Sequence, residues 1–304
     1  MKKLDMRKNE TPGFLITFCG LDGCGKTTMM KRLIADLEKS SEIFVTKQPT
    51  NAVRNSEIFR TYMDSPNHDA FDYRSLSLLA ASDRLQHVNK IIEPEMNEGR
   101  IVLSDRYFYS CFANLRARGF EKDRWIYEIA RSVIKPDVAF FFDVPVEEAV
   151  TRVRRRPEEK ERYIDIELQH RLRKEYIDIC ASNKGILVST LQSEDECYEI
   201  VKNAVFSAIA TKSRTILQKT ITERRNLQME GNKKDNIDLN ISNTEIKTDV
   251  PHISDKTQDS QEYAGYPEEY MNDTFYFDHL CTSCKYWDGG MCCTEYGICN
   301  YEPI

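Results

Sequence analysis

Long hydrophobic runs are missing from this sequence. No apolar stretch approaches the roughly 20 residues that a membrane-spanning helix needs. The basic segment 1–9 leads straight into a short apolar run, without the apolar region and small-residue cleavage site of a signal peptide. We therefore expect a cytoplasmic protein with no membrane partner. In that reducing compartment, cysteines are more often buried, reactive or metal-bound than paired in disulfides.

An excess of positive charge is also missing. The chain has 43 Lys and Arg against 49 Asp and Glu, a net charge of −6 at pH 7, so we expect no nucleic-acid partner. Hydrophobic residues make up 40% and charged residues 30% of the chain, a balance typical of globular proteins. The length of 304 residues is greater than one compact domain usually needs and fits a domain with an appendage.

Aromatic side chains are absent between Phe206 and Tyr263, and much of this interval is rich in Asn, Asp, Lys and Ser. Such a segment buries too little apolar surface to offset the entropy lost on ordering. We therefore divide the chain into a main domain over residues 11–212, a flexible linker over 213–262 and a small cysteine-rich module over 263–304. The alternative for the start of the linker is a helix over 213–229 that extends the last helix of the domain.

Short apolar runs alternate with longer helical patterns through the main domain. Five runs lack polar alternation, which is typical of strands covered on both faces; they are 14–19, 43–46, 101–104, 138–144 and 186–190. The helical patterns lie at 26–39, 74–98, 123–133, 146–155, 161–181 and 194–210. This alternation predicts an α/β protein, a three-layer fold with a five-stranded parallel sheet flanked by helices.

The first strand ends in a segment that fits the phosphate-binding pattern G-x-x-x-x-G-K-[ST]. The residues expected to cradle the nucleotide are Gly20, Gly23, Gly25, Lys26, Thr27 and Thr28. Glycines let backbone N–H groups turn toward phosphate oxygens, and the following helix directs its positive dipole end to the same place. Lys26 can reach the β- and γ-phosphates, and Thr27 can offer a hydroxyl to Mg²⁺. A chance match is disfavoured because the motif lies between a strand and a helix, so we predict a P-loop protein that uses ATP and Mg²⁺.

A second group of charged residues follows the third strand, where Asp105 and Arg106 are neighbours. A carboxylate at the carboxyl end of a strand beside a P-loop usually holds Mg²⁺-bound water, and an arginine there can bind a phosphate through two hydrogen bonds. The alternative for Asp105 is a structural ion pair that closes the strand. Within the P-loop, Asp22 would be repelled by a triphosphate unless a metal or a substrate hydroxyl compensates, which predicts a place near Mg²⁺ or the acceptor.

Taken together, these residues resemble the thymidylate kinase family of P-loop nucleoside monophosphate kinases. The matching segments, in the family's order, are 20–28, 46–49, 81–87, 105–107 with Ser110, 135–137 and 143–145. The resemblance covers roughly residues 11–212. It implies an ATP- and Mg²⁺-dependent transfer to a deoxynucleoside monophosphate, dTMP first of all, and a homodimer.

The resemblance also implies roles for single residues. Arg106 would hold the acceptor phosphate, Asp22 would lie near that phosphate and the sugar, and Arg84 would reach the base. Further positions that line the substrate site in the family are here Pro49, Tyr107 and Asn114.

A mobile lid covers the transferring group in this family. The residue after Asp22 is Gly23 and not an arginine, so the chain resembles the branch in which the lid supplies the transition-state arginine. The arginines of the lid region are Arg152, Arg154, Arg155, Arg156 and Arg162. We take Arg154 and Arg155 as the catalytic candidates, and we expect at least two of the first four to lie on a solvated helix face.

The base pocket departs from the family's pattern. Ala80 stands where the family usually has a phenylalanine that stacks on the base, a contact that contributes about 1–3 kcal/mol. Asn114 stands where it usually has a tyrosine, and Lys47-Gln48-Pro49 replaces the usual Arg-Glu-Pro. The phosphate machinery therefore predicts the reaction more firmly than the pocket predicts the base. The alternatives are a deoxynucleoside kinase, disfavoured by Arg106, and a non-catalytic nucleotide-binding regulator.

Half of the ten cysteines crowd the C-terminus. They are Cys281, Cys284, Cys292, Cys293 and Cys299. Four thiolates can form a tetrahedral zinc site, and His279 is a further candidate ligand. A module this small buries too little apolar surface to fold without such a metal site. We therefore predict a structural Zn²⁺ site that serves an unidentified protein partner. The alternatives are an iron–sulfur cluster and free thiols in a disordered tail.

Overall fold

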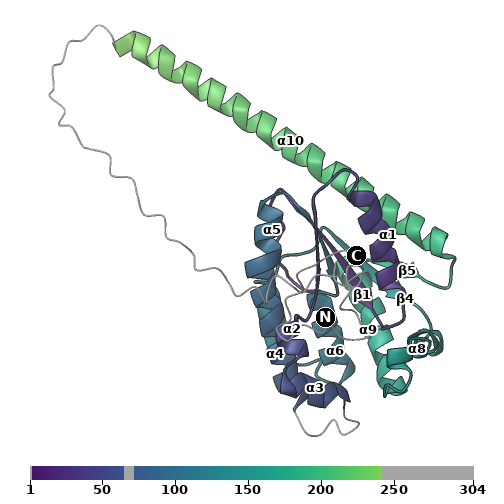
Figure 1. The fold of residues 1–304 in the computed structure, drawn as a ribbon. Helices are drawn as coiled ribbons and strands as arrows, with labels where there is room; N and C mark the ends of the chain where they lie inside the picture. Colours follow the sequence, from purple (N-terminus) through teal and green to yellow (C-terminus); the bar gives the residue numbers. More distant parts are fainter. Residues whose placement is uncertain (1, 65–71, 242–304) are drawn as a thin grey trace, which may run out of the picture. The chain divides into compact units, whose positions relative to one another are not determined.

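A five-stranded parallel sheet forms the centre of the computed structural model (Figure 1), which describes residues 2–64 and 72–241. Its strands are β1 (Phe14–Gly20), β2 (Ile43–Lys47), β3 (Ile101–Asp105), β4 (Val138–Asp143) and β5 (Ile186–Ser189). Their order is β2-β3-β1-β4-β5, and every neighbouring pair is parallel. The predicted α/β fold is thereby confirmed.

The strand order places helices on both faces of this sheet. The helices are α1 (Lys26–Leu37), α2 (Asn51–Arg54), α3 (Glu57–Asp64), α4 (Tyr73–His87), α5 (Glu93–Asn97), α6 (Phe108–Ala117), α7 (Trp125–Ala130), α8 (Val146–Arg154), α9 (Ile166–Asn183) and α10 (Glu194–Ile241). Parallel strands are joined by right-handed crossovers. The β1–β2 connection through α1 runs one way along the sheet and the β3–β4 connection through α6 runs the other way, so α1 and α6 cover opposite faces.

Aromatic side chains fill both layers of the core. On one face, the ring of Phe141 lies 5.4 Å from that of Tyr109 on α6 and 6.4 Å from that of Tyr176 on α9. On the other face, Phe18 contacts Phe140 and Phe142, because alternate residues of a strand point to opposite sides. All seven residues of β1 are buried, which explains why the strand shows no polar alternation.

Several helices differ from the pattern expected from the sequence. The expected helix over 74–98 is three pieces, α4, a π-helical turn (Val88–Ile92) and α5. Helices α2, α3 and α6 had no counterpart in the expected pattern. Eight of the ten residues of α6 are buried, so it carries no amphipathic period that would reveal a helix.

An N-terminal strap precedes β1 and consists of residues 2–8. The N–H of Leu4 donates to Oδ1 of Asn183 at 2.8 Å, and Nδ2 of Asn183 donates to the carbonyl of Lys2 at 2.9 Å. The N–H of Arg7 donates to the carbonyl of Val133 at 2.9 Å. The strap therefore ties the end of α9 to the loop before β4.

Helix α10 continues to Ile241 and so covers part of the segment expected as a linker over 213–262. Its residues up to 208 belong to the same compact unit as the sheet, and its residues from 209 onward belong to a second unit. None of the described helices is both long enough and apolar enough to cross a membrane. The cysteine cluster at 281–299 lies outside the described residues.

Candidate active site

The P-loop connects β1 to α1 and depends on backbone conformations that favour glycine. Gly20, Gly23 and Gly25 have φ angles of 139°, 81° and 88°. A Cβ atom on Gly23 would lie 2.3 Å from the carbonyl oxygen of Ala149 on α8, so a side chain there would push α8 away. The loop therefore takes its shape from both its own glycines and the packing of α8.

Lys26 begins α1 and folds back over the P-loop. Its Nζ donates hydrogen bonds to the carbonyl of Leu21 at 2.7 Å and to that of Gly20 at 3.3 Å. No acidic side chain and no side-chain cap occupies the first turn of α1. The first N–H groups of α1 are thus left to a ligand, and a helix N-terminus with free N–H groups favours a phosphate.

Arg106 is held in an unusual backbone conformation just after β3. Its φ angle is 67°, which costs a residue with a side chain on the order of 1–3 kcal/mol. Its N–H donates to the carbonyl of Phe18 at 2.8 Å, and Ser104 Oγ donates to its carbonyl at 2.7 Å. These bonds fix the backbone so that the guanidinium turns toward the P-loop.

Asp22 joins the P-loop to two arginines. Its Oδ1 accepts a short bond from Nη2 of Arg106, and its Oδ2 lies 3.3 Å from Nη2 of Arg162 in the loop between α8 and α9. Burial alone would raise the pKa of Asp22, but Arg106, Lys26 and Arg162 hold that pKa well below its usual range. Burial acts against the charge of Arg106, yet the Asp22 carboxylate raises the pKa of Arg106 above its ordinary value. Three cations and one carboxylate thus converge where two phosphates would meet.

Asp105 lies at the end of β3 with one oxygen unused. Its Oδ2 is 3.7 Å from Nζ of Lys47, whereas its Oδ1 is buried and has no hydrogen-bond partner among the described residues. A buried carboxylate oxygen without a partner fits a bound cation or its water. Together with the hydroxyl of Thr27, Asp105 is therefore suited to hold Mg²⁺, which would offset the charge of the phosphates. Mg²⁺ is usually bound by only one or two protein groups beside substrate phosphates.

The predicted base-binding arginine lies deeper, between α4 and α6. Arg84 is only 4% exposed. Its Nη1 donates to the carbonyl of Ala80 at 2.8 Å, and its Nε has no partner among the described residues. A buried donor without an acceptor is costly, so this site favours a ligand that brings one.

His87 supports the loop that carries Pro49. Its Nε2 lies 2.9 Å from Oγ1 of Thr46, and its Nδ1 lies 3.1 Å from Nε2 of Gln48. Because the Gln48 amide nitrogen can only donate, Nδ1 accepts and Nε2 carries the proton. Burial lowers the pKa of His87 to about 4, so the ring is neutral at pH 7.

Asp83 fixes the same loop from α4. Its carboxylate accepts from the N–H of Thr50 at 2.9 Å and from the Thr50 hydroxyl in a shorter bond. Thr50 precedes α2 as its cap residue. Pro49 is therefore held between two hydrogen-bonded neighbours, Gln48 and Thr50, beside the acceptor side of the site.

Two predicted substrate residues are already engaged within the protein. Tyr107 is fully buried, and its hydroxyl donates to the carbonyl of Ile134 at 2.7 Å, a placement that favours a packing role. Asn114 accepts a hydrogen bond from Arg118 through Oδ1 at 2.8 Å and donates to the carbonyl of Ser110 at 2.9 Å.

The structure brings Arg162, and not Arg154 or Arg155, to the P-loop. Arg154 and Arg155 are exposed at the end of α8. Arg162 is anchored by Glu159 at 3.0 Å and reaches Asp22. Sequence reasoning placed Arg162 in the lid region but gave no means of choosing it.

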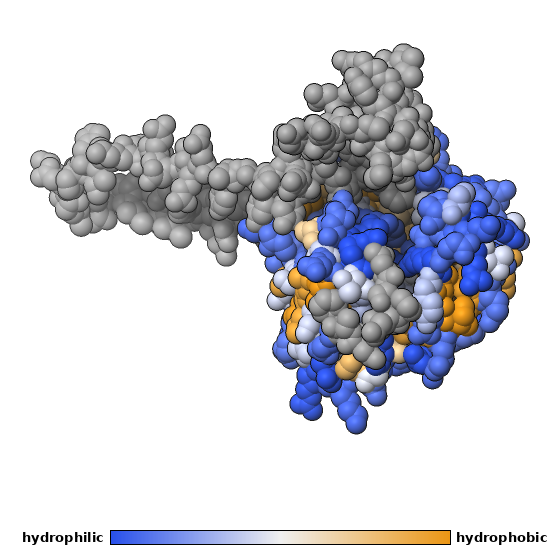
Figure 2. Space-filling view, turned by 60° about the horizontal axis from the view of Figure 1, so that its bottom comes forward, coloured by the Kyte–Doolittle hydropathy of each residue, from blue (hydrophilic) through white to orange (hydrophobic). Residues whose placement is uncertain are grey.

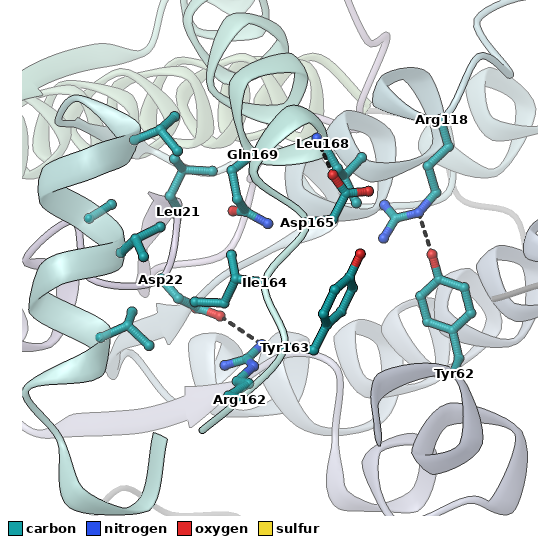
Figure 3. A pocket seen from close by; sticks show the side chains of 14 residues that line it. Leu21, Asp22, Tyr62, Arg118, Arg162, Tyr163, Ile164, Asp165, Leu168 and Gln169 are labelled. Carbon is teal, nitrogen blue, oxygen red and sulfur yellow. Dashed lines mark hydrogen bonds and ion pairs between the residues drawn. The ribbon is translucent and has the colours of Figure 1, made fainter. Parts of the chain in front are cut away.

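A cleft runs from Asp22 and Arg162, past the ring of Tyr163, to Arg118 and Tyr62 (Figure 3). Its wall also includes apolar side chains of α8. The end of the molecule that carries α3 and α8 is turned toward the viewer in Figure 2, where hydrophilic residues dominate the described surface and apolar ones form smaller patches. The cleft thus joins the anion site at Asp22 and Arg162 to the cluster at Arg118 and Tyr62.

The sheet order, the P-loop and the arginine-built anion site beside it define a P-loop kinase. A sequence profile of the thymidylate kinase family matches residues 18–204. A probable thymidylate kinase of Thermococcus kodakarensis is 33% identical over 198 residues, which cover 63% of this chain and 95% of the relative. A probable thymidylate kinase of Pyrococcus horikoshii is 36% identical over 170 residues, which cover 55% of this chain and 82% of the relative. The thymidylate kinase of Lactobacillus acidophilus is 29% identical over 221 residues, which cover 69% of this chain and 98% of the relative. The chain belongs to the thymidylate kinase family, whose members are phosphotransferases.

Proposed function

We propose that this protein transfers the γ-phosphoryl group of ATP to dTMP and forms dTDP. The observation that carries the proposal is the convergence of Arg106 and Arg162 on Asp22 beside Lys26. A P-loop alone needs one set of cations for ATP. The pair of arginines next to it suits an acceptor that already carries a phosphate, and membership of the thymidylate kinase family supports dTMP as that acceptor.

Each residue then has a role in phosphoryl transfer. The P-loop N–H groups and Lys26 bind the β- and γ-phosphates, and Arg106 binds the acceptor phosphate, whose oxygen attacks the γ-phosphorus in line. Arg162 stabilises the charge on the phosphoryl oxygens as the bond to ADP breaks. In the unliganded protein Asp22 pairs with both arginines, and after dTMP binds it is free to accept a hydrogen bond from the sugar.

The test is an acceptor panel with ATP and Mg²⁺, in which ADP formation is measured for dTMP, dUMP, dCMP, dAMP, dGMP and thymidine. We expect the highest kcat/KM with dTMP and no turnover of thymidine, because Arg106 would have no phosphate to bind. Turnover of thymidine in preference to dTMP would make the protein a deoxynucleoside kinase. ATP binding without turnover of any acceptor would make it a non-catalytic regulator.

We also propose that the protein acts as a cytoplasmic homodimer that pairs through α4. Leu78 and Leu79 on this helix are 45% and 36% exposed, and neighbouring exposed leucines favour a protein contact. Analytical ultracentrifugation should give a dimer for the wild type and a monomer for Leu78→Glu combined with Leu79→Glu. Leu187→Glu, at a similarly exposed site on β5, is the matched control and should remain dimeric.

For the C-terminal module we propose one structural Zn²⁺ held by four of its five cysteines, in support of an unidentified partner protein. The spacing of Cys281 and Cys284 supports this proposal. Metal analysis of the full chain should give one zinc per protein, and the variant with both cysteines changed to serine should give none. Recovery of iron and inorganic sulfide instead would show an iron–sulfur cluster.

A further inference from the structure

Arg118 forms a cluster that the family's motifs do not include. It follows the last residue of α6, and its Nε donates to the hydroxyl of Tyr62 on α3 at 2.6 Å. Its Nη1 donates to Oδ1 of Asn114 at 2.8 Å and to the carbonyl of Asn114 at 3.3 Å. Its Cζ lies 4.1 Å from the ring centre of Tyr73 on α4, and that ring stacks on Phe120. Three helices thus fix one guanidinium.

This arrangement leaves part of the guanidinium for a ligand. Nε and Nη1 use their N–H groups within the protein, whereas Nη2 donates to no residue that the structure describes. No carboxylate within the described residues pairs with Arg118. A rigid, planar cation with two remaining donors is well suited to an oxygen acceptor in a fixed position.

The free part of Arg118 faces the nucleotide cleft. Arg118 and Tyr62 line the same cleft as Asp22 and Arg162, and Figure 3 shows the ring of Tyr163 between the two pairs. Asp22 and Arg162 mark the phosphate end. Arg118 therefore lies at the end that the nucleoside part of the acceptor would occupy.

The position of Tyr73 connects this cluster with the missing ring at Ala80. Residues 73, 80 and 84 are seven and four apart, so Tyr73, Ala80 and Arg84 share one face of α4. Ala80 presents no ring to the acceptor base, while Tyr73, two turns earlier, holds Arg118 in place. Asn114, which stands where the family usually has a tyrosine, orients the same guanidinium. One of the two departures, Asn114, thus contacts Arg118 directly, and the other, Ala80, lies on the helix face that also carries its partner Tyr73.

We propose that Arg118 is a specificity-determining residue that donates hydrogen bonds from Nη2 to a carbonyl oxygen of the acceptor base. Together with Arg84, which also has donors only, it selects bases rich in carbonyl oxygens, such as thymine and uracil, over bases with an amino group at the same edge. Cytosine would present a donor to a donor, and neither hydrogen bond could form. This inference rests on the proposed function, because it concerns the acceptor of the same reaction.

The test is the kinetics of Arg118→Ala and Arg118→Lys with dTMP, dCMP and ATP. A hydrogen bond from a charged donor contributes enough for roughly a ten-fold effect or more. We therefore expect the KM for dTMP to rise at least ten-fold, the KM for ATP to stay within two-fold, and the preference for dTMP over dCMP to fall. Lysine should not restore the wild-type values, because it lacks the planar fork. Arg131→Ala, at an exposed arginine on the surface, is the matched control and should behave as the wild type.

The Tyr62→Phe variant is a second, milder test of the role of Arg118, because it does not remove the cation. It deletes only the hydroxyl that orients Nε, so we expect an intermediate rise in the KM for dTMP. The inference would be overturned if Arg118→Lys and Tyr62→Phe both left the KM for dTMP and the preference for dTMP over dCMP unchanged. Equal rises in the KM for dTMP and in the KM for ATP would also overturn it. Wild-type protein that turns over no nucleotide would instead contradict the proposed function. In that case calorimetry should be used to compare the affinity for dTMP of the wild type with that of Arg118→Lys. Equal affinities would overturn the proposed role of Arg118.

Discussion

At the phosphate end of the site, Arg106, Arg162 and Lys26 surround the carboxylate of Asp22, whereas at the proposed base end the buried Arg84 makes no ion pair with any carboxylate that the structure describes. At the phosphate end, two of the three cations, Arg106 and Arg162, pair with Asp22 in the unliganded protein. At the proposed base end, Nε of Arg84 and Nη2 of Arg118 have no acceptor within residues 2–64 and 72–241.

This difference indicates how one fold can keep the same reaction while its recognition of the acceptor base changes. Phosphoryl transfer requires charges at fixed positions, and Asp22, Lys26 and Arg106 sit at the P-loop and at the end of a parallel strand, where the sheet fixes them, while Arg162 reaches them from the loop between α8 and α9. In our proposal the base is recognised by side chains of α3, α4 and α6, which can exchange one contact for another. Variants at the phosphate end should therefore slow every acceptor alike, and variants at the base end should change the order of acceptors.

The largest effect is expected from Lys26→Ala. Without the ammonium group, the charge on the β- and γ-phosphates is not stabilised, so kcat should fall about 10³-fold or more for every acceptor. Steady-state kinetics measures this, with Lys31→Ala on the exposed side of α1 as the matched control. Unchanged turnover would reject the assignment of the P-loop, and a loss confined to one acceptor would break the comparison.

Arg162→Ala should come next, with a fall in kcat between about 10²- and 10³-fold. The cause is the loss of one cation at the transferring group, so the KM values should change much less than kcat. Arg154→Ala and Arg155→Ala are the controls, because both side chains are exposed. A larger loss from either control than from Arg162→Ala would return the catalytic role to α8.

His87 should make the acceptor side sensitive to acid. Its pKa is about 4 in the folded protein and about 6.5 when unfolded. The unfolded chain thus binds the extra proton first as pH falls, and stability should decline by about 3 kcal/mol between pH 6.5 and 4. Urea unfolding across this range measures the decline, and His87→Gln should flatten it. The exposed His170→Gln is the control, and an equal slope in wild type and His87→Gln would contradict this account.

The smallest effect concerns the backbone of Arg106. Both Arg106→Ala and Arg106→Gly remove the guanidinium and should weaken dTMP binding more than ATP binding. Only glycine relieves the positive φ angle of 67°, so the glycine variant should be more stable by about 1 kcal/mol. Thermal unfolding of the two variants checks the sign, and greater stability of the alanine variant would show that the backbone conformation is unstrained.

The sequence predicted the sheet and the phosphate end because both leave local patterns. A wholly apolar run marks a strand buried on two faces, and the P-loop glycines mark a turn that only they adopt easily. Helix α6 escaped prediction because burial on nearly all sides removes the periodic pattern. The position of Arg162 depends on the path of the loop between α8 and α9, where Asp165 caps α9 through the N–H of Leu168 at 2.9 Å.

The base end could not be predicted because it combines residues that are distant in the sequence. Tyr62, Tyr73 and Arg118 come from three helices, and nothing in their local spacing indicates that they meet. Tyr107 shows the opposite case. Its place in the Asp-Arg-Tyr segment suggested a substrate contact. The turn at Arg106 instead directs the tyrosine into the core, where the carbonyl of Ile134 accepts a hydrogen bond from its hydroxyl.

The N-terminal strap has a consequence for the order in which the chain acquires its structure during synthesis. Residues 2–8 leave the ribosome before their partners at Val133 and Asn183, which follow more than a hundred residues later. The strap must therefore wait, unpaired, until α9 has been translated. Its docking shows that the chain has been made as far as α9, so residues synthesised before β1 find their place only after β4 and α9 exist.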